Sequence, residues 1–330
     1  MNKEGKPYPQ QFGSRLNRGL RGLPSRLRGS GVSQWALAWR RLRKNKAAVA
    51  GLMIVAVIGV MAIFQDQVAP YPPKCLVGLD PRCPSPSGRT DEWQIRQPPS
   101  VQHPFGTDGN GYDVYSQIVY GARPAFLVGI GATAISIGIA ILIGLVAGYS
   151  GGWIDNVLMR ITEVFLVMPF FLILLVFLRV FEAQTGSGGG VIWIVIAIIG
   201  IFSWSGAARI IRGEVLHVRE FEYIAASRQI GSSSSRILFR HLFPNVLHII
   251  VVLATLQVAV SILTEAGVSF LGFGDTNTLT WGRLLTDASS NVKQAWWAGA
   301  FPGIFITLLV MGFNLFGNGL RDALDPRLRE

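Results

Sequence analysis

The chain has 330 residues, of which 50% are hydrophobic and only 15% are charged, and its formal net charge is +11. So few charged side chains cannot give a chain of this length an ordinary soluble surface, which excludes a soluble globular protein. Together with a mean hydropathy of +0.40, the composition predicts an integral membrane protein.

The N-terminal segment, residues 1–46, is strongly basic. It carries twelve Lys or Arg residues against the single acid Glu4, and its last residues abut an uncharged run. Positive charge beside a first span is typical of a cytoplasmic end, and this position argues against nucleic-acid binding. Residues 1–33 show no apolar periodicity, so we expect a disordered or surface-bound leader.

Six apolar blocks are long enough to cross a bilayer as helices. The first, residues 47–64, has 18 uncharged residues and would be about 27 Å long as a helix. It lacks a signal-peptide cleavage site, so we expect an uncleaved anchor. The other blocks cover residues 125–148, 157–178, 191–207, 246–270 and 297–318. The prediction is therefore an all-α protein with six transmembrane helices and both termini in the cytoplasm, including the tail 321–330.

Residues 65–123 are predicted to form an external loop. Five basic residues there face six acidic ones, so the cationic bias of the N-terminus is absent. The loop holds the chain's two cysteines, Cys75 and Cys83, which form a disulfide in an oxidising compartment or remain two free thiols. We expect no metal site, because zinc requires more ligands than gather here. Residues 106–123 are amphipathic and offer either an exposed surface or a plain anchor for the loop.

The core 124–320 contains a charged segment, residues 208–245, that six arginines assign to the cytoplasm. Within it, Phe221, Ile224, Ala225 and Arg228 are spaced along one helical face. Gly231 is expected to end that helix in a left-handed conformation, and the serine run 232–235 to cap the next. We call residues 220–245 the elbow. It is either a docking structure or an ordinary loop.

Two further patterns lie within the predicted spans. Four polar residues recur every fourth position and share one helical face: Gln257, Ser261, Glu265 and Ser269. They line a cavity or bond to neighbouring helices. Glycines form a second pattern, with a GxxxG pair at 144 and 148 and further glycines at 131 and 138. It predicts close helix packing, with a hinge as the alternative.

No catalytic motif accompanies these spans. The chain lacks a metalloprotease HExxH helix, a GxSxG turn and a GxxxxGK[ST] phosphate loop. We therefore expect no enzyme, no bound cofactor and no ATP hydrolysis by this chain. Energy for active transport would have to enter through a partner.

Several ordered motifs carry a resemblance to a known family. They are HPFGTDGNGYDVYSQIVYGAR at 103–123, TEAGVSFLGFG at 264–274, TWGRLL at 280–285 and NLFGNGLRDALDPRLR at 314–329. Gly231 and Pro244 also have the thirteen-residue spacing of a coupling loop. The chain resembles the second permease of dipeptide, oligopeptide and nickel importers of the ABC class. Where the wider superfamily has Glu-Ala-Ala, this chain has Ala225, Ala226 and Ser227, and Glu222 one turn earlier is the candidate acid.

The resemblance implies a type I ABC importer permease in the inner membrane. Residues 220–235 would dock on one or two cytoplasmic ATPases, which bind ATP and Mg²⁺ in place of this chain. The implied contacts are Phe221, Tyr223, Ile224 and Arg228. The other implied partners are a paralogous permease that forms a heterodimer with this chain, an external substrate-binding protein, and a peptide.

Two alternatives remain open from the sequence. A nickel or other small-solute importer of the same branch would share these motifs. A secondary transporter or channel would need ion-coupling residues in its spans, for which Glu163 and Glu265 are the candidates. It would leave the elbow without a purpose.

Overall fold

The computed structural model describes residues 39–72, 95–185, 190–275 and 278–324. Within these ranges every regular element is a helix, and β-pairing is limited to an isolated bridge between Thr107 and Asp113. The all-helical prediction is confirmed for this part of the chain.

Four helical stretches are long and apolar enough to cross a membrane. They are α3 (Lys46–Ile63), α5 (Val114–Ser150), α12 (Phe243–Phe270) together with the turns before it, and α14 (Trp296–Leu324). Two bent pairs also qualify, α6 (Gly152–Val167) with α7 (Phe170–Thr185) and α8 (Val191–Phe202) with α9 (Ser205–Val218). Counting each pair as one span gives up to six, the predicted number.

Both broken spans differ from the continuous helices that were predicted. The α6–α7 pair bends by 78° at Met168, which is extended with ψ 134°. Pro169 follows and disfavours the helical conformation of the residue before it. The α8–α9 pair bends by 41°, with no proline between residues 199 and 208.

Helix α5 begins at Val114, well before the predicted start near residue 125. Asp113 caps it, because its Oδ2 accepts a hydrogen bond from the Ser116 N–H at 2.8 Å. Trp281 covers the first turns, and its Nε1 donates to the Ile118 carbonyl at 2.9 Å. The first helical turns are therefore largely buried inside the chain and do not form an exposed amphipathic surface.

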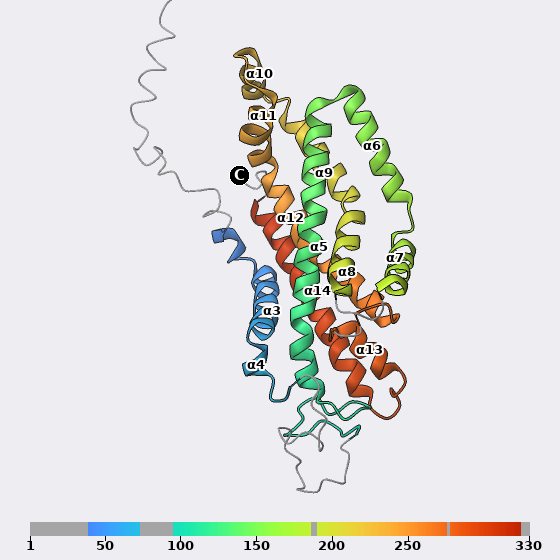
Figure 1. Ribbon diagram of the computed structural model, residues 1–330. Coiled ribbons are helices and arrows are strands. Elements are labelled where there is room, and N and C mark those ends of the chain that lie inside the picture. The colour runs from blue at the N-terminus through green and yellow to red at the C-terminus, as the bar shows by residue number, and fades with distance from the viewer. Residues whose placement is uncertain (1–38, 73–94, 186–189, 276–277, 325–330) are drawn as a thin grey trace, which may run out of the picture.

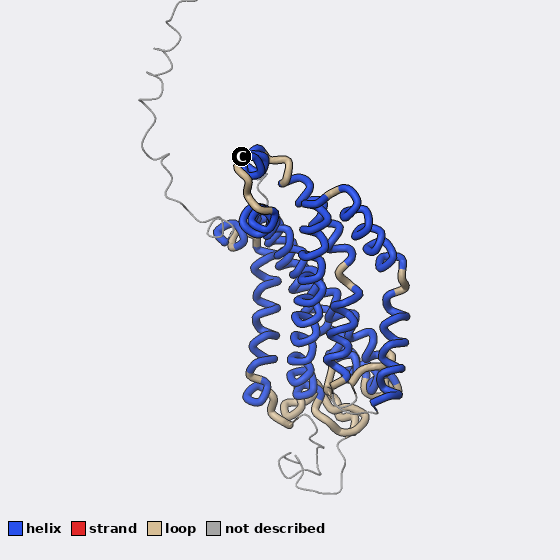
Figure 2. The backbone as a smooth tube through the Cα atoms, turned by 45° about the horizontal axis from the view of Figure 1, so that its top comes forward, coloured by secondary structure: helices blue, strands red, loops and turns tan. Residues whose placement is uncertain are grey.

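The spans form an elongated bundle with α5 running along its length (Figure 1). Helices α3 and α14 lie side by side, while α6 and α7 stand at the opposite flank (Figures 1 and 2). The short helices α10 (Glu222–Gln229) and α11 (Ser234–Arg236) form one tip, which we call the elbow end. Helix α13 (Trp281–Ser289) lies at the other, the α13 end, toward which α4 (Gln65–Val68) also points.

Glycines bring α5 close to α9, as the GxxxG pair predicts. A Cβ on Gly144 would lie 2.8 Å from the Ala208 carbonyl oxygen, and one on Gly148 would lie 2.7 Å from Val215 Cβ. Neither position has room for a side chain, so the two backbones approach closely. Gly131 faces α8, whereas a Cβ on Gly138 would meet nothing within 4 Å.

Helix α6 is attached to α9 by an ion pair. Arg212 donates from Nε and Nη2 to the two carboxylate oxygens of Asp155, each at 2.5 Å. This bidentate geometry is the strong form of an Arg–carboxylate contact. It joins the flank of the bundle to the helix that leads into the elbow.

Candidate functional site

The elbow turns at Gly231, where the sequence predicts it. Gly231 has φ +77°, a left-handed conformation that costs glycine little. The Ser232 N–H donates to the Ser227 carbonyl at 3.1 Å and the Gly231 N–H to the Arg228 carbonyl at 3.0 Å. These two bonds form a Schellman end, which satisfies the last carbonyls of α10 and defines the turn.

The serine run does not cap the next helix through its side chains, contrary to expectation. Ser233 occupies the N-cap position of α11, but its side chain makes no capping hydrogen bond. The hydroxyl of Ser234 is used differently, since it accepts a hydrogen bond from the Tyr149 hydroxyl at 3.3 Å. The chain after the turn is therefore held by a contact with α5.

A π-helical turn, η3 (Ile237–Leu242), connects α11 to α12. The Phe243 N–H at its end donates to the Leu238 carbonyl, five residues back. Pro244 lies in the first turn of α12 and has no N–H to offer to a preceding carbonyl. Pro244, which the sequence singled out by its spacing from Gly231, thus lies where the π-helical turn ends and the long regular helix α12 begins.

Buried side chains fix α10 against this turn. Ile224 is fully buried, as are Ile237 and Leu242, and the three belong to one apolar core. In a regular α-helix, residues five apart point about 140° away from each other. The wider π-turn reduces this angle, so Ile237 and Leu242 both reach the core beneath Ile224.

Two contacts attach the elbow to the end of α5. Arg219, just before α10, donates from Nη1 to the Gly148 carbonyl at 2.9 Å. The guanidinium carbon of Arg228 lies 5.2 Å from the centre of the Tyr149 ring, within cation–π range. Since Tyr149 also bonds Ser234, a single side chain of α5 contacts both limbs of the elbow.

The outer surface of the elbow is apolar and aromatic. Four large side chains are exposed there: Phe221 (40%), Tyr223 (41%), Ile230 (81%) and Phe239 (63%). Partial burial raises the pKa of the Tyr223 hydroxyl, which therefore stays neutral near neutral pH. We call these four residues the elbow patch. Large exposed apolar side chains on a tip that is held in this way are typical of a protein-binding surface.

Most of the predicted contact residues are exposed. Glu222, Ala225, Ala226 and Arg228 are exposed, and Phe221 and Tyr223 belong to the patch. Ile224 points inward, so it anchors α10 and is unavailable at the surface. Ile230 and Phe239 are also exposed on the elbow and were not among the predicted contact residues. An isoleucine directly before the turn glycine, in a charged segment, was the available signal.

The second predicted set, the four polar residues on one face of α12, lies mostly inside the chain. Ser261, Glu265 and Ser269 are at most 4% exposed, and Gln257 is partly buried. Ser269 donates to Glu265 Oε1 at 2.6 Å, and Thr280, the N-cap of α13, also hydrogen-bonds this carboxyl group. For Glu265 and Ser269 the geometry favours bonding between neighbouring elements over an open cavity.

A buried clamp lies at the α13 end. His103 is 2% exposed, and its Nδ1 lies 3.0 Å from Asp113 Oδ1. Tyr71 packs on the His103 ring with ring centres 5.2 Å apart, and its N–H donates to Ser116 Oγ. The clamp ties the segment after α4 and the segment before α5 to the cap of α5. Cys75 and Cys83 lie outside the described residues.

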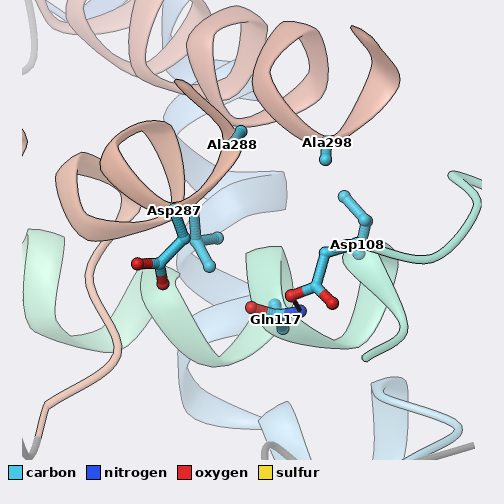
Figure 3. A pocket seen from close by; sticks show the side chains of 7 residues that line it. Asp108, Gln117, Asp287, Ala288 and Ala298 are labelled. Atoms are coloured by element: carbon cyan, nitrogen blue, oxygen red, sulfur yellow. Dashed lines mark hydrogen bonds between the residues drawn. The ribbon is translucent and has the colours of Figure 1, made fainter. Parts of the chain in front are cut away.

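A small pocket beside this clamp contains two carboxylates (Figure 3). Asp108 accepts hydrogen bonds from the Tyr112 N–H at 2.9 Å and from Gln117 Nε2 at 2.9 Å. Burial raises the pKa of Asp108. The pKa of Asp287 is also raised, first by burial, with the Asp108 charge adding to it and Arg283 opposing it.

The described residues contain no group of three His, Cys, Asp or Glu side chains arranged to hold a metal ion. The fold and the elbow define a helical membrane protein with several spans and an apolar tip. Residues 140–330 match the binding-protein-dependent transport system inner membrane component family, and residues 33–99 match the N-terminal transmembrane domain of oligopeptide transport permease C. The chain belongs to this family of transport permeases.

Curated relatives are similar in sequence to this chain along most of its length. The dipeptide transport system permease protein DppC of Bacillus subtilis is 39% identical, covering 88% of this chain and 85% of the relative. The oligopeptide transport system permease protein OppC of Bacillus subtilis is 35% identical, over 91% and 92%. OppC of Mycobacterium tuberculosis H37Rv is 35% identical, over 90% and 96%. The family is one of transport and not of catalysis.

Proposed function

We propose that this chain is one of two permease subunits of an ATP-driven peptide importer in the inner membrane. The observation that carries this proposal is the elbow patch, an exposed apolar surface on a tip attached to α5 by Arg219 and Tyr149. A rigidly held tip transmits the displacement of a docked partner to the spans, whereas a flexible loop would absorb it.

The charge pattern supports an orientation in which the elbow end faces the cytoplasm. The basic N-terminal segment and the six arginines of residues 208–245 favour a cytoplasmic elbow end. Both ends of the described chain, near residues 39 and 324, lie toward that end (Figure 1), as an even number of spans requires. A type I ABC importer permease with two cytoplasmic termini accounts for this arrangement.

The partners follow from this orientation. One or two cytoplasmic ATPases dock on the elbow and hydrolyse ATP with Mg²⁺. A paralogous permease completes a heterodimer, and an external binding protein delivers the substrate to the α13 end. The names of the curated relatives favour dipeptides or oligopeptides, with a nickel importer of the same branch as the alternative.

We place the translocation path between the two permeases, where transporters commonly bind their substrates at repeat interfaces. Ser261, Glu265 and Ser269 are buried in this chain, so they are not assigned to that path. The same burial weakens the case for a secondary transporter, because Glu265 already bonds Ser269 and Thr280. Glu163, the other candidate, pairs with Arg160 on an exposed surface.

Affinity purification of the tagged full chain from mild detergent tests the docking role. We expect an ATPase and a second permease to copurify with the wild type, and Ile230→Asp to lose the ATPase while keeping the permease. Ile230 is 81% exposed, so this change adds a charge to the patch without disturbing the core. Gly231→Arg should act in the same way.

Val101→Asp is the matched control, because Val101 is fully exposed at the opposite end of the molecule. It should retain both partners. A chain purified alone, and active in transport without ATP, would instead support a secondary transporter.

A further inference from the structure

The turn before α3 carries a dense group of basic side chains. Residues 39–46 contain five Lys or Arg residues and no acid. Four of the five are exposed and have no ion pair or side-chain hydrogen bond with another residue that the structure describes: Arg40, Arg43, Lys44 and Lys46. Their positive charge is therefore available to a partner outside the chain.

This basic turn is held in place by the protein. Leu42 is 3% exposed and shares a small apolar core with Ala48 of α3 and Ala323 of α14. The Asn45 N–H donates to the Leu42 carbonyl at 3.0 Å, and the Asn45 side chain caps α3 by accepting from the Ala48 N–H at 3.2 Å. The basic side chains thus extend from a fixed backbone, which lowers the entropy that is lost when they bind a ligand.

One face of α3 is covered by the chain itself. Its buried residues are Ala48, Gly51, Ile58 and Ala62. A Cβ on Gly51 would lie 2.6 Å from the carbonyl oxygen of Gly312, so this face packs directly on α14.

The opposite face of α3 is an exposed apolar stripe. Met53, Val57, Val60 and Phe64 are each at least half exposed, and their spacing of four, three and four residues places them on one side of the helix. Lys46 lies two turns before Met53 on the same side. From Lys46 to Phe64 the stripe is about 27 Å long, close to the thickness of the hydrocarbon layer of a bilayer.

The basic turn lies where this stripe ends. Figure 1 shows it at the end of α3 that points toward the elbow end. Trp39, at the start of the turn, is 52% exposed. Exposed tryptophan and basic side chains beside the end of a span are typical of the headgroup level of a membrane.

We propose that residues 39–46 bind the phosphate headgroups of anionic phospholipids, whose acyl chains lie along the exposed stripe of α3. The charges are complementary, and guanidinium groups form bidentate hydrogen bonds with phosphate. A free phosphate would use the basic turn alone, whereas a phospholipid also covers the apolar stripe that continues from it. This lipid site is independent of the proposed docking of an ATPase on the elbow.

Native mass spectrometry of the purified full chain tests this site, with phosphatidylglycerol and phosphatidylcholine of identical acyl chains as probes. We expect the wild type to bind phosphatidylglycerol more tightly. Each basic residue near an anionic lipid surface is worth about a fivefold gain in binding. Arg40→Gln/Arg43→Gln should therefore weaken phosphatidylglycerol binding by about 25-fold and hardly change phosphatidylcholine binding. Unchanged phosphatidylglycerol binding in this variant would overturn the proposal.

Arg236→Gln/Arg240→Gln is the matched control, because it removes the same charge from two exposed arginines of the elbow. It should keep the wild-type preference for phosphatidylglycerol. An equal loss in both variants would show an effect of net charge and contradict a site at residues 39–46. Glycerol phosphate, which has the headgroup chemistry without acyl chains, should not displace the lipid, and displacement would point to a site for a free anion instead.

Photo-crosslinking in intact membranes identifies what covers the stripe. A benzophenone side chain introduced at Val57, which is 61% exposed in the middle of the stripe, should form adducts with phospholipid that mass spectrometry of the chain detects. A protein adduct at this position would assign the stripe to a second permease or a second copy of this chain, and would overturn the proposed lipid contact.

Discussion

The protonation of a single residue, Asp108, is expected to change the stability of the folded chain. The residue is 9% exposed, and its carboxylate accepts bonds from the Asn110 and Tyr112 N–H groups and from Gln117. Burial outweighs these bonds and raises the pKa of Asp108. The neighbouring Asp287 has a raised pKa for the same first reason. The pKa values of two carboxyl groups are therefore both raised at residues that line one small pocket at the α13 end (Figure 3).

The pH dependence of stability follows from the direction of these shifts. A carboxyl whose pKa is higher in the folded than in the unfolded state binds its proton first in the folded state. The unfolding free energy should therefore rise as pH falls through the folded pKa, and the full gain is present below the unfolded pKa. Thermal unfolding of the purified chain across mildly acidic to neutral buffers measures this slope.

Asp108→Asn should flatten that slope and raise Tm at neutral pH, because it removes a buried charge. Its amide oxygen still accepts the Asn110 and Tyr112 N–H bonds, and the Gln117 amide turns its oxygen toward the new NH₂ group. Asp322→Asn, an equal charge change on the exposed last turns of α14, serves as the control and should leave the slope unchanged. A steeper slope in Asp108→Asn would contradict this assignment.

At the scale of elements, the close packing of α5 against α9 depends on glycine. Their contact is formed where Gly144 and Gly148 meet the backbone and β-branched side chains of α9. The Arg219 bond to the Gly148 carbonyl continues the contact into the elbow. Loss of this close approach would loosen both the span and the tip that follows it.

Gly148→Ala and Gly138→Ala form a matched pair that tests this packing. The Cβ at position 148 would lie 2.7 Å from Val215, so we expect a destabilisation of about 1–3 kcal/mol from overpacking. At position 138 a Cβ meets nothing within 4 Å, and alanine should stabilise the helix by roughly 0.5–1 kcal/mol. Denaturant or thermal unfolding distinguishes them. Equal effects at the two positions would show that packing against α9 does not matter.

At the scale of the whole molecule, the two ends differ in character. The elbow end exposes aromatic and aliphatic side chains on a fixed tip, whereas the α13 end is a compact cap held by the His103–Asp113 clamp and by Trp297, which bonds the Thr107 carbonyl. The proposed orientation places these ends on opposite sides of a membrane.

Thiol accessibility tests that orientation in a background with Cys75 and Cys83 replaced by serine. A membrane-impermeant reagent should label Val101→Cys from outside intact spheroplasts, and Ile230→Cys only in inverted vesicles. Both positions are exposed, so burial does not limit the reaction. Labelling of both from the same side would rule out the six-span topology.

The sequence by itself determined the membrane class, the apolar blocks that form its helices and the position of the turn. These follow from local properties, since an apolar run of span length needs no partner to be recognised and Gly231 ends a helix through its own backbone freedom. The family resemblance rested on ordered motifs of the same local kind.

Only the tertiary structure decided which faces are buried. The spacing that placed Ile224 among surface contacts could not show that the π-turn carries Ile237 and Leu242 beneath it. Likewise, Glu265 and Ser269 share a helical face that suits a cavity or a packed interface equally well, and the position of Thr280 makes it an interface. Periodicity identifies a face of a helix, but what covers that face depends on residues distant in the chain.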